Sequence, residues 1–135
     1  MTQPKGSLTA HQYEIMQVVW DTGPEGVAST TIWEKICARR DVTRTTVVNQ
    51  VERLHRRGWL VRREEAGLIR YTAAVSHQQA VQLLAGEFLD DFFGGSASEL
   101  VASLQGSRRL KAAEVQRLRA VLDETKTRGD GRDKP

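Results

Sequence analysis

The chain of 135 residues has a formal net charge of +3, with 39% hydrophobic and 27% charged residues, which excludes wholesale disorder and indicates one modest folded core. No apolar run approaches the ~18 residues of a membrane span, and the opening MTQPKGS lacks the apolar segment of a secretory signal, so we expect a cytoplasmic protein without membrane insertion. The single cysteine excludes an internal disulfide, and we predict neither a metal site nor a cofactor.

The first predicted helix covers residues 9–22. Its first four residues, Thr9 to Gln12, fit a capping box, in which the Thr and Gln side chains each accept a backbone N–H. An apolar face follows, formed by Ile15, Met16, Val19 and Trp20. Residues 1–7 before it are polar, and we expect them to be disordered.

A second helix is predicted through Ala38 or Arg39, with Ser29 or Thr30 as its N-cap and with Ile32 and Ile36 facing inward. Either Trp33 or Cys37 completes its buried face, so Cys37 is interpreted as a small core residue. In the connection before this helix, Val27 is expected to make a short strand contact.

The third predicted helix begins after the cap residue Thr43 and ends near Arg57. Its inward stripe consists of Val47, Val51 and Leu54, and its opposite face is polar, carrying Thr45, Asn49, Glu52 and Arg56 with Arg53 at the edge. By itself this pattern fits a solvated helix as well as a helix that enters the DNA major groove. The short connection from the preceding helix favours a helix-turn-helix.

Basic residues concentrate in this part of the chain. Between Arg39 and Arg63 lie eight arginines, against the two acidic residues Asp41 and Glu52. Such an excess is typical of a surface that binds a polyanion.

Residues 59–72 then read as strand, turn and strand, with the turn at residues 65–67. Leu60 and either Ile69 or Tyr71 are expected to face the helices. A hairpin that follows a helix-turn-helix is the wing of a winged-helix domain. The predicted fold is therefore mainly α with a small β-hairpin, and residues 8–75 form the DNA-binding domain.

The sequence pattern of residues 76–125 predicts three short amphipathic helices. They carry more large apolar side chains than so small an arm can bury, so we predict a homodimer joined through them. Folding back onto the winged helix in a monomer is the alternative. Residues 126–135 are expected to be disordered. The predicted dimerisation residues are Leu84, Phe88, Phe92, Phe93, Leu100, Leu104, Val115, Leu118 and Leu122.

Four motifs in order give the chain a resemblance to the penicillinase-repressor family, the BlaI/MecI/CopY group of bacterial winged-helix repressors. They are LTAHQYEIMQVVW at residues 8–20, the pattern T-V-x-N-x-V-x-R-L at residues 46–54 followed by Arg57-Gly58, then Arg70-Tyr71, and Phe93 to Ser96. The similarity covers residues 8–124.

The resemblance implies a dimeric transcriptional repressor that binds a pseudo-palindromic, double-stranded operator. Thr45, Thr46 and Asn49 would approach the bases. Asn49 stands where the family often has Thr, so a different operator is expected, because Asn can pair bidentately with adenine. The residues expected at the DNA backbone are Thr43, Arg44, Arg53, Arg56, Arg62, Arg63 and Arg70.

Family members of the β-lactam type are released from DNA when a membrane sensor protease triggers cleavage at an Asn-Phe bond. The matching position here reads Ser103-Leu104, so proteolytic release is an open alternative. Copper-responsive members carry paired cysteines near the C-terminus, and this chain has none after Cys37.

Repression has two alternatives. An enzyme is not predicted, because the three histidines are far apart in sequence and no nucleophile or metal motif is present. The alternative is a winged-helix regulator controlled by a small molecule near the arm, with Trp59, Phe88, Phe92 and Phe93 lining its pocket.

Overall fold

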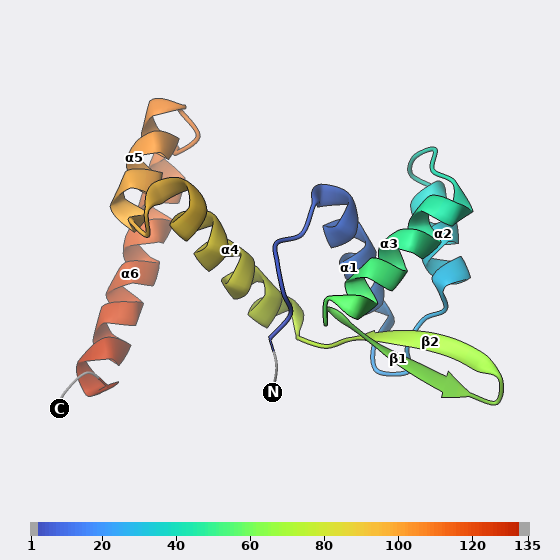
Figure 1. Cartoon of the computed structure of the whole chain (residues 1–135). Coiled ribbons are helices and arrows are strands. Elements are labelled where there is room, and N and C mark those ends of the chain that lie inside the picture. Colours follow the sequence, from blue (N-terminus) through green and yellow to red (C-terminus); the bar gives the residue numbers. More distant parts are fainter. Residues whose placement is uncertain (1–2, 133–135) are drawn as a thin grey trace. The chain divides into compact units, whose positions relative to one another are not determined.

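A computed structural model describes the backbone of residues 3–132 and the side chains of residues 3–124 (Figure 1). Along the chain the elements are α1 (Ala10–Thr22), α2 (Ser29–Cys37), α3 (Arg44–Arg56), β1 (Leu60–Glu65), β2 (Leu68–Ala73), α4 (His77–Phe93), α5 (Ala97–Gly106) and α6 (Ala112–Arg132). The predicted fold class, mainly α with one hairpin, is confirmed.

The chain divides into two compact units, Met1–Glu87 and Phe88–Pro135, which we call the N-terminal and C-terminal units. The division lies inside α4, whereas the sequence placed the domain boundary after Val75. The physical reason is that Ala80 is fully buried and Leu84 packs against the core of the N-terminal unit. The first half of α4 therefore belongs to the winged helix.

One hydrophobic core holds the N-terminal unit together. It is built from α1, α2, α3, the hairpin, Val27 and the first half of α4, and its largest fully buried side chain is Trp59. Of the stripes predicted for α1 and α3, the buried members are Ile15, Met16 and Val19 in α1 and Val47, Val51 and Leu54 in α3. Trp20, the fourth predicted residue of α1, is only partly buried against this core.

The capping box of α1 forms as predicted. The Thr9 hydroxyl accepts the Gln12 N–H at 3.1 Å, and the Gln12 side chain accepts the Thr9 N–H at 3.1 Å. Helix α2 differs from its prediction, because its N-cap is Ala28, which offers no side-chain acceptor.

Cys37 is exposed, so its interpretation as a core residue is wrong. Ile32 and Ile36, one helical turn apart, form the buried stripe of α2. The next residue is rotated by about 100° from Ile36 and points away from the core. Trp33 packs at the edge of the core instead.

The hairpin pairs Leu60 with Ala73 through to Glu65 with Leu68, which leaves a two-residue turn at Ala66-Gly67. Both turn residues have positive φ, 52° and 79°, as a type I′ turn requires. Of the two alternatives for the inward residue of β2, Tyr71 is buried and Ile69 is only partly buried.

Val27 makes the predicted short strand contact. Its N–H donates to the Tyr71 carbonyl at 2.9 Å and its carbonyl accepts the Tyr71 N–H at 2.8 Å. Gly26 permits this approach: its φ is +82°, and a Cβ there would lie 3.2 Å from the Tyr71 carbonyl oxygen.

Residues 3–7 were expected to be disordered, but they form hydrogen bonds with residues at the end of α3 and just after it. Polar groups there need donors and acceptors, and this segment supplies them. The Lys5 N–H donates to the Arg57 carbonyl at 2.9 Å. In return, the Lys5 carbonyl accepts Arg57 Nε at 3.0 Å and the Trp59 indole at 3.3 Å.

The C-terminal unit lacks a buried core of the kind seen in the N-terminal unit, as far as its residues are described. Among its described residues no side chain is fully buried, and α5 and α6 pack little against one another. Phe88 lies 5.0 Å from Phe92 and 5.7 Å from Phe93 between ring centroids.

Helix α6 continues to Arg132, past the predicted end at residue 125. Residues 1–2 and 133–135, also predicted to be disordered, lie outside the described residues.

Candidate nucleic-acid interface

Helices α2 and α3 form a helix-turn-helix whose turn is held by side chains. The Trp33 indole donates to the Val42 carbonyl at 3.0 Å. Arg40 donates to Glu14 of α1 at 3.0 Å, and Arg39 lies 3.7 Å from the same carboxylate. Two arginines of the basic stretch are therefore occupied in orienting the turn.

The middle of α3 is joined to α1 by a second contact. The Gln12 side chain, which is buried, donates to the Gln50 amide oxygen at 2.9 Å. Together with the buried stripe of α3, this bond sets which side of the helix faces outward. The exposed residues of that side are Arg44, Thr45, Thr46, Asn49, Arg53 and Arg56.

The three predicted base-reading residues are thus all exposed, but their hydrogen-bonding states differ. Thr43 caps α3 by accepting the Thr46 N–H at 3.2 Å, and the two hydroxyl oxygens lie 2.8 Å apart. Thr46 therefore has an internal partner. Within residues 3–124, the side chains of Thr45 and Asn49 have no hydrogen-bond partner, so their polar groups are available to a ligand.

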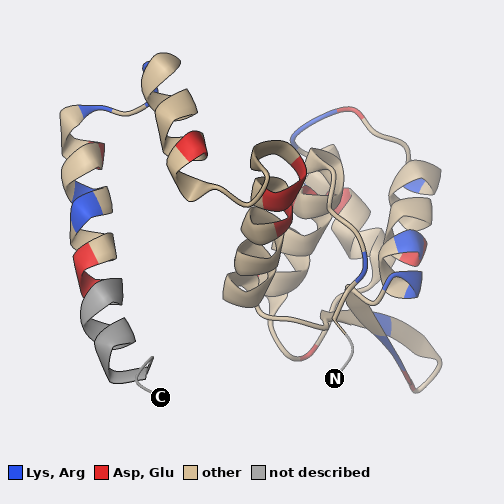
Figure 2. Cartoon of the chain, turned by 60° about the vertical axis from the view of Figure 1, so that its left-hand side comes forward, with Lys and Arg blue, Asp and Glu red and all other residues tan. Residues whose placement is uncertain are grey.

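The arginines near α3 divide into two groups by their contacts; Figure 2 marks the positions of Lys and Arg in blue along the ribbon. Arg44, Arg53 and Arg56 form no ion pair or hydrogen bond with any described residue. Arg57, by contrast, donates to the carbonyls of Lys5 and Ser7 and to Gln12. The free cations accordingly lie along the outward side of α3.

The three arginines of the wing do not share one face. Arg62 lies opposite Tyr71, on the inner face that packs toward α3, whereas Arg63 lies opposite Arg70 on the other face. Arg63 donates to the carbonyls of Pro24 and Glu25 at 2.9 and 3.2 Å.

A small charged cluster joins the inner face of the wing to α3. Glu52 Oε1 lies 3.6 Å from Arg62 Nη1. Burial raises the pKa of the Tyr71 hydroxyl, the Glu52 carboxylate raises this pKa further, and Arg62 opposes the shift. The His55 ring lies 6.2 Å from the Tyr71 ring.

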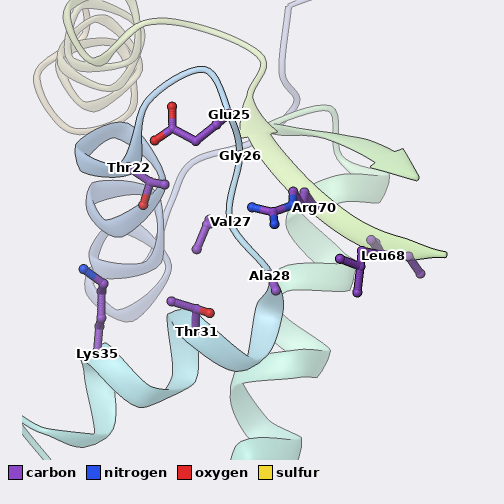
Figure 3. A pocket seen from close by; sticks show the side chains of 10 residues that line it. Thr22, Glu25, Gly26, Val27, Ala28, Thr31, Lys35, Leu68 and Arg70 are labelled. Carbon is purple, nitrogen blue, oxygen red and sulfur yellow. The ribbon is translucent and has the colours of Figure 1, made fainter. Parts of the chain in front are cut away.

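The outer face of the wing borders a pocket of about 420 Å³ between β2, the loop after α1 and the start of α2 (Figure 3). Val27 and Leu68 form apolar parts of its lining, and Arg70 and Lys35 are its cationic members with Glu25 as the acid. The aromatic pocket proposed from the sequence is different. Trp59, one of its expected walls, is fully buried in the core, so it cannot line an open site.

Most of the predicted dimerisation residues are incompletely buried in the single chain. Phe92 is 72% exposed, Leu122 58% and Phe88 48%. Leu84 differs from the others, because it packs against the core of the N-terminal unit. The remaining members are half-buried: Phe93, Leu100, Leu104, Val115 and Leu118.

The position that matches the family's cleavage bond lies within α5. Ser103 is exposed and Leu104 is half-buried. Among the helices that the structure describes, none has an apolar stretch of the length that a membrane span needs. The same part of the chain contains no group of three or more His, Cys, Asp or Glu side chains arranged to hold a metal ion.

Comparison with known proteins gives one family model, the penicillinase repressor, which matches residues 8–124. The methicillin resistance regulatory protein MecI of Mammaliicoccus sciuri is 21% identical over 86% of this chain and 93% of its own length. The penicillinase repressor of Bacillus licheniformis is 20% identical over 87% of this chain and 90% of its length.

Among solved structures, the transcriptional regulator SlyA is similar with a TM-score of 0.44 and 26% identity, over 90% of this chain and 76% of that one. A mutant of MepR from S. aureus is similar with a TM-score of 0.46 and 17% identity, over 89% and 79%.

Proposed function

The chain belongs to the penicillinase repressor family and is a transcriptional repressor rather than an enzyme; we propose that it acts by binding a pseudo-palindromic operator as a homodimer. In this proposal α3 enters the major groove and the hairpin lies along the DNA backbone.

The outward side of α3 is the observation that carries the proposal. Thr45 and Asn49 present hydrogen-bonding groups that have no partner among the described residues. Asn can pair bidentately with adenine in the major groove, and the Thr methyl can contact thymine. Arg44, Arg53 and Arg56 lie beside them, free to bind phosphates.

Thr46 and Thr43 have narrower roles in the proposal. The Thr46 hydroxyl is engaged with Thr43, which leaves the methyl group of Thr46 for contact with a base. Thr43 fixes the start of α3 next to the phosphate backbone.

The wing supplies the remaining backbone contacts through Arg62, Arg63 and Arg70. Since Arg62 is on the face opposite to the other two, we propose that it contacts the strand nearest α3. Arg70 contacts phosphates beyond the hairpin, and Arg63 does so with the N–H groups that its bonds to the Pro24 and Glu25 carbonyls leave over.

Dimerisation is supported by the apolar side chains of the C-terminal unit. Phe88, Phe92, Val121 and Leu122 are each between 48% and 72% exposed, and a monomer that exposes so many large apolar groups is prone to associate. A two-fold dimer would read two half-sites whose centres are separated by about 10–10.5 bp or a multiple of it.

Selection of bound fragments from genomic DNA tests the proposal. The expected result is a pseudo-palindrome with affinity that falls steeply as salt rises, because released counterions dominate protein–DNA affinity. Bound fragments without a shared motif, or with affinity insensitive to salt, would contradict it.

A membrane sensor protease is a further partner that the family resemblance implies. Co-expression with a membrane metalloprotease from the same operon is the corresponding test. Cleavage at Ser103-Leu104 would support proteolytic release, and an intact chain under inducing conditions would argue against it.

A further inference from the structure

Glu52 is the single acidic residue of α3, between Arg44 and Arg56. A carboxylate on a helix that approaches phosphates repels them, so its presence on an otherwise basic helix needs a physical reason.

The contacts of Glu52 are with the wing rather than with its own helix. Its Oε1 is 3.6 Å from Arg62 Nη1. Its Oε2 is buried and has no hydrogen-bond partner among the described residues. Tyr71, opposite Arg62 in the hairpin, lies within electrostatic range of both. Glu52 is therefore directed toward the junction between α3 and the wing.

Stability does not account for this arrangement. The two charged side chains are 36% and 41% exposed and form no hydrogen bond with each other, and ion pairs of this kind contribute little to stability. The buried, unpaired Oε2 opposes folding rather than favouring it.

We propose that Glu52 is a positioning residue that restrains Arg62 and thereby weakens binding to non-operator DNA. Binding without sequence recognition depends on how many cations neutralise phosphates. An arginine held and partly neutralised by a carboxylate adds less to that binding. In the operator complex α3 is seated in the groove, and the restrained Arg62 lies where a phosphate meets it. This inference rests on the proposed function.

The test is Glu52→Gln, which removes the charge and keeps the shape. Binding to the selected operator and to a scrambled duplex of the same length is measured over a series of salt concentrations. We expect affinity for the scrambled duplex to rise about threefold to tenfold at low salt, with a salt slope steeper by about 0.9, the value for one further neutralised phosphate. Affinity for the operator should change less, so the ratio of the two affinities falls.

Two comparisons separate this role from a general change in charge. Glu64→Gln removes a carboxylate from β1, the strand that carries Arg62, and Glu64 forms no ion pair within residues 3–124. It should leave the salt slope unchanged. In an Arg62→Ala background, Glu52→Gln should have no further effect.

An equal effect of Glu64→Gln, or an effect of Glu52→Gln that persists without Arg62, would overturn the inference. Unchanged or weakened binding of Glu52→Gln to the scrambled duplex would also overturn it, provided that circular dichroism shows a folded protein. If the wild-type chain preferred no DNA sequence, that result would contradict the proposed function instead. The two outcomes can be distinguished, because the measurement on the scrambled duplex does not depend on an operator.

Discussion

Gln12 and Gln50 are joined by a side-chain hydrogen bond of 2.9 Å that links the first turn of α1 to the middle of α3. The Gln12 amide nitrogen donates this bond, while its amide oxygen accepts the Thr9 N–H at 3.1 Å and an Arg57 N–H at 3.3 Å. One buried amide thus caps α1, orients α3 and holds Arg57. Because buried polar groups are costly when unpaired, these contacts are strongly interdependent.

Gln12→Ala should lower the free energy of unfolding by about 2 kcal/mol, since it removes the capping contact, leaves the Gln50 amide oxygen without its donor and takes one of its acceptors from Arg57. Urea unfolding measures the change. Gln17→Ala, at an exposed position of the same helix, is the control and should change stability by less than about 0.5 kcal/mol. Equal effects of the two substitutions would show that Gln12 has no special role.

Ala66→Asn should stabilise the protein by about 1 kcal/mol. Ala66 has a φ of 52°, a left-handed conformation that is unfavourable for alanine and that Asn tolerates in type I′ turns. Gly67→Ala should destabilise by a similar amount, because its φ is 79°. Thermal unfolding of both variants provides the measurement, and a shift of the same sign in both would refute the assignment of the turn.

Local patterns predicted most of the N-terminal unit because they report contacts close in sequence. Thr9 and Gln12 satisfy a capping rule that spans three residues, and Val47, Val51 and Leu54 share one face by helical periodicity. The prediction for Cys37 was wrong because helical periodicity allowed two alternatives for the last buried position of α2. Only the packing of α2 against α1 and α3 decides between them.

The sequence could not predict which arginines form hydrogen bonds within the protein. Arg57 binds the carbonyl of Lys5, and Arg63 binds those of Pro24 and Glu25. These partners are separated by 52, 39 and 38 positions. A count of basic residues treats all arginines as equal, whereas tertiary contacts leave only some free for DNA.

Asn49→Ala should relax base preference at one operator position and weaken operator binding by about 1–3 kcal/mol. Arg53→Ala, one helical turn further along α3, should weaken operator and scrambled duplexes alike, as expected for a phosphate contact. Binding to a panel of single-base operator variants distinguishes the two results. An even loss of affinity across the panel for both variants would place the reading side of α3 elsewhere.

Phe92→Asp should convert the proposed dimer to a monomer, because it replaces the most exposed aromatic ring of the described chain by a charged group. Light scattering reports the mass. Gln82→Asp, at an exposed polar position of the same helix, should leave the dimer intact. An unchanged mass for Phe92→Asp would remove this ring from the interface.

Tyr71 should make stability fall at alkaline pH. Burial, and secondarily Glu52, raise the pKa of its hydroxyl in the folded state above the ordinary value of 10.0. The unfolded chain then loses this proton first as pH rises, so the free energy of unfolding declines above about pH 10, whereas below it the hydroxyl is protonated in both states. Tyr71→Phe should abolish this part of the decline in urea unfolding between about pH 8 and pH 11. Tyr13→Phe leaves the cluster of Glu52, Arg62 and Tyr71 unchanged and should retain the decline; the reverse pattern would assign the alkaline loss to a different tyrosine.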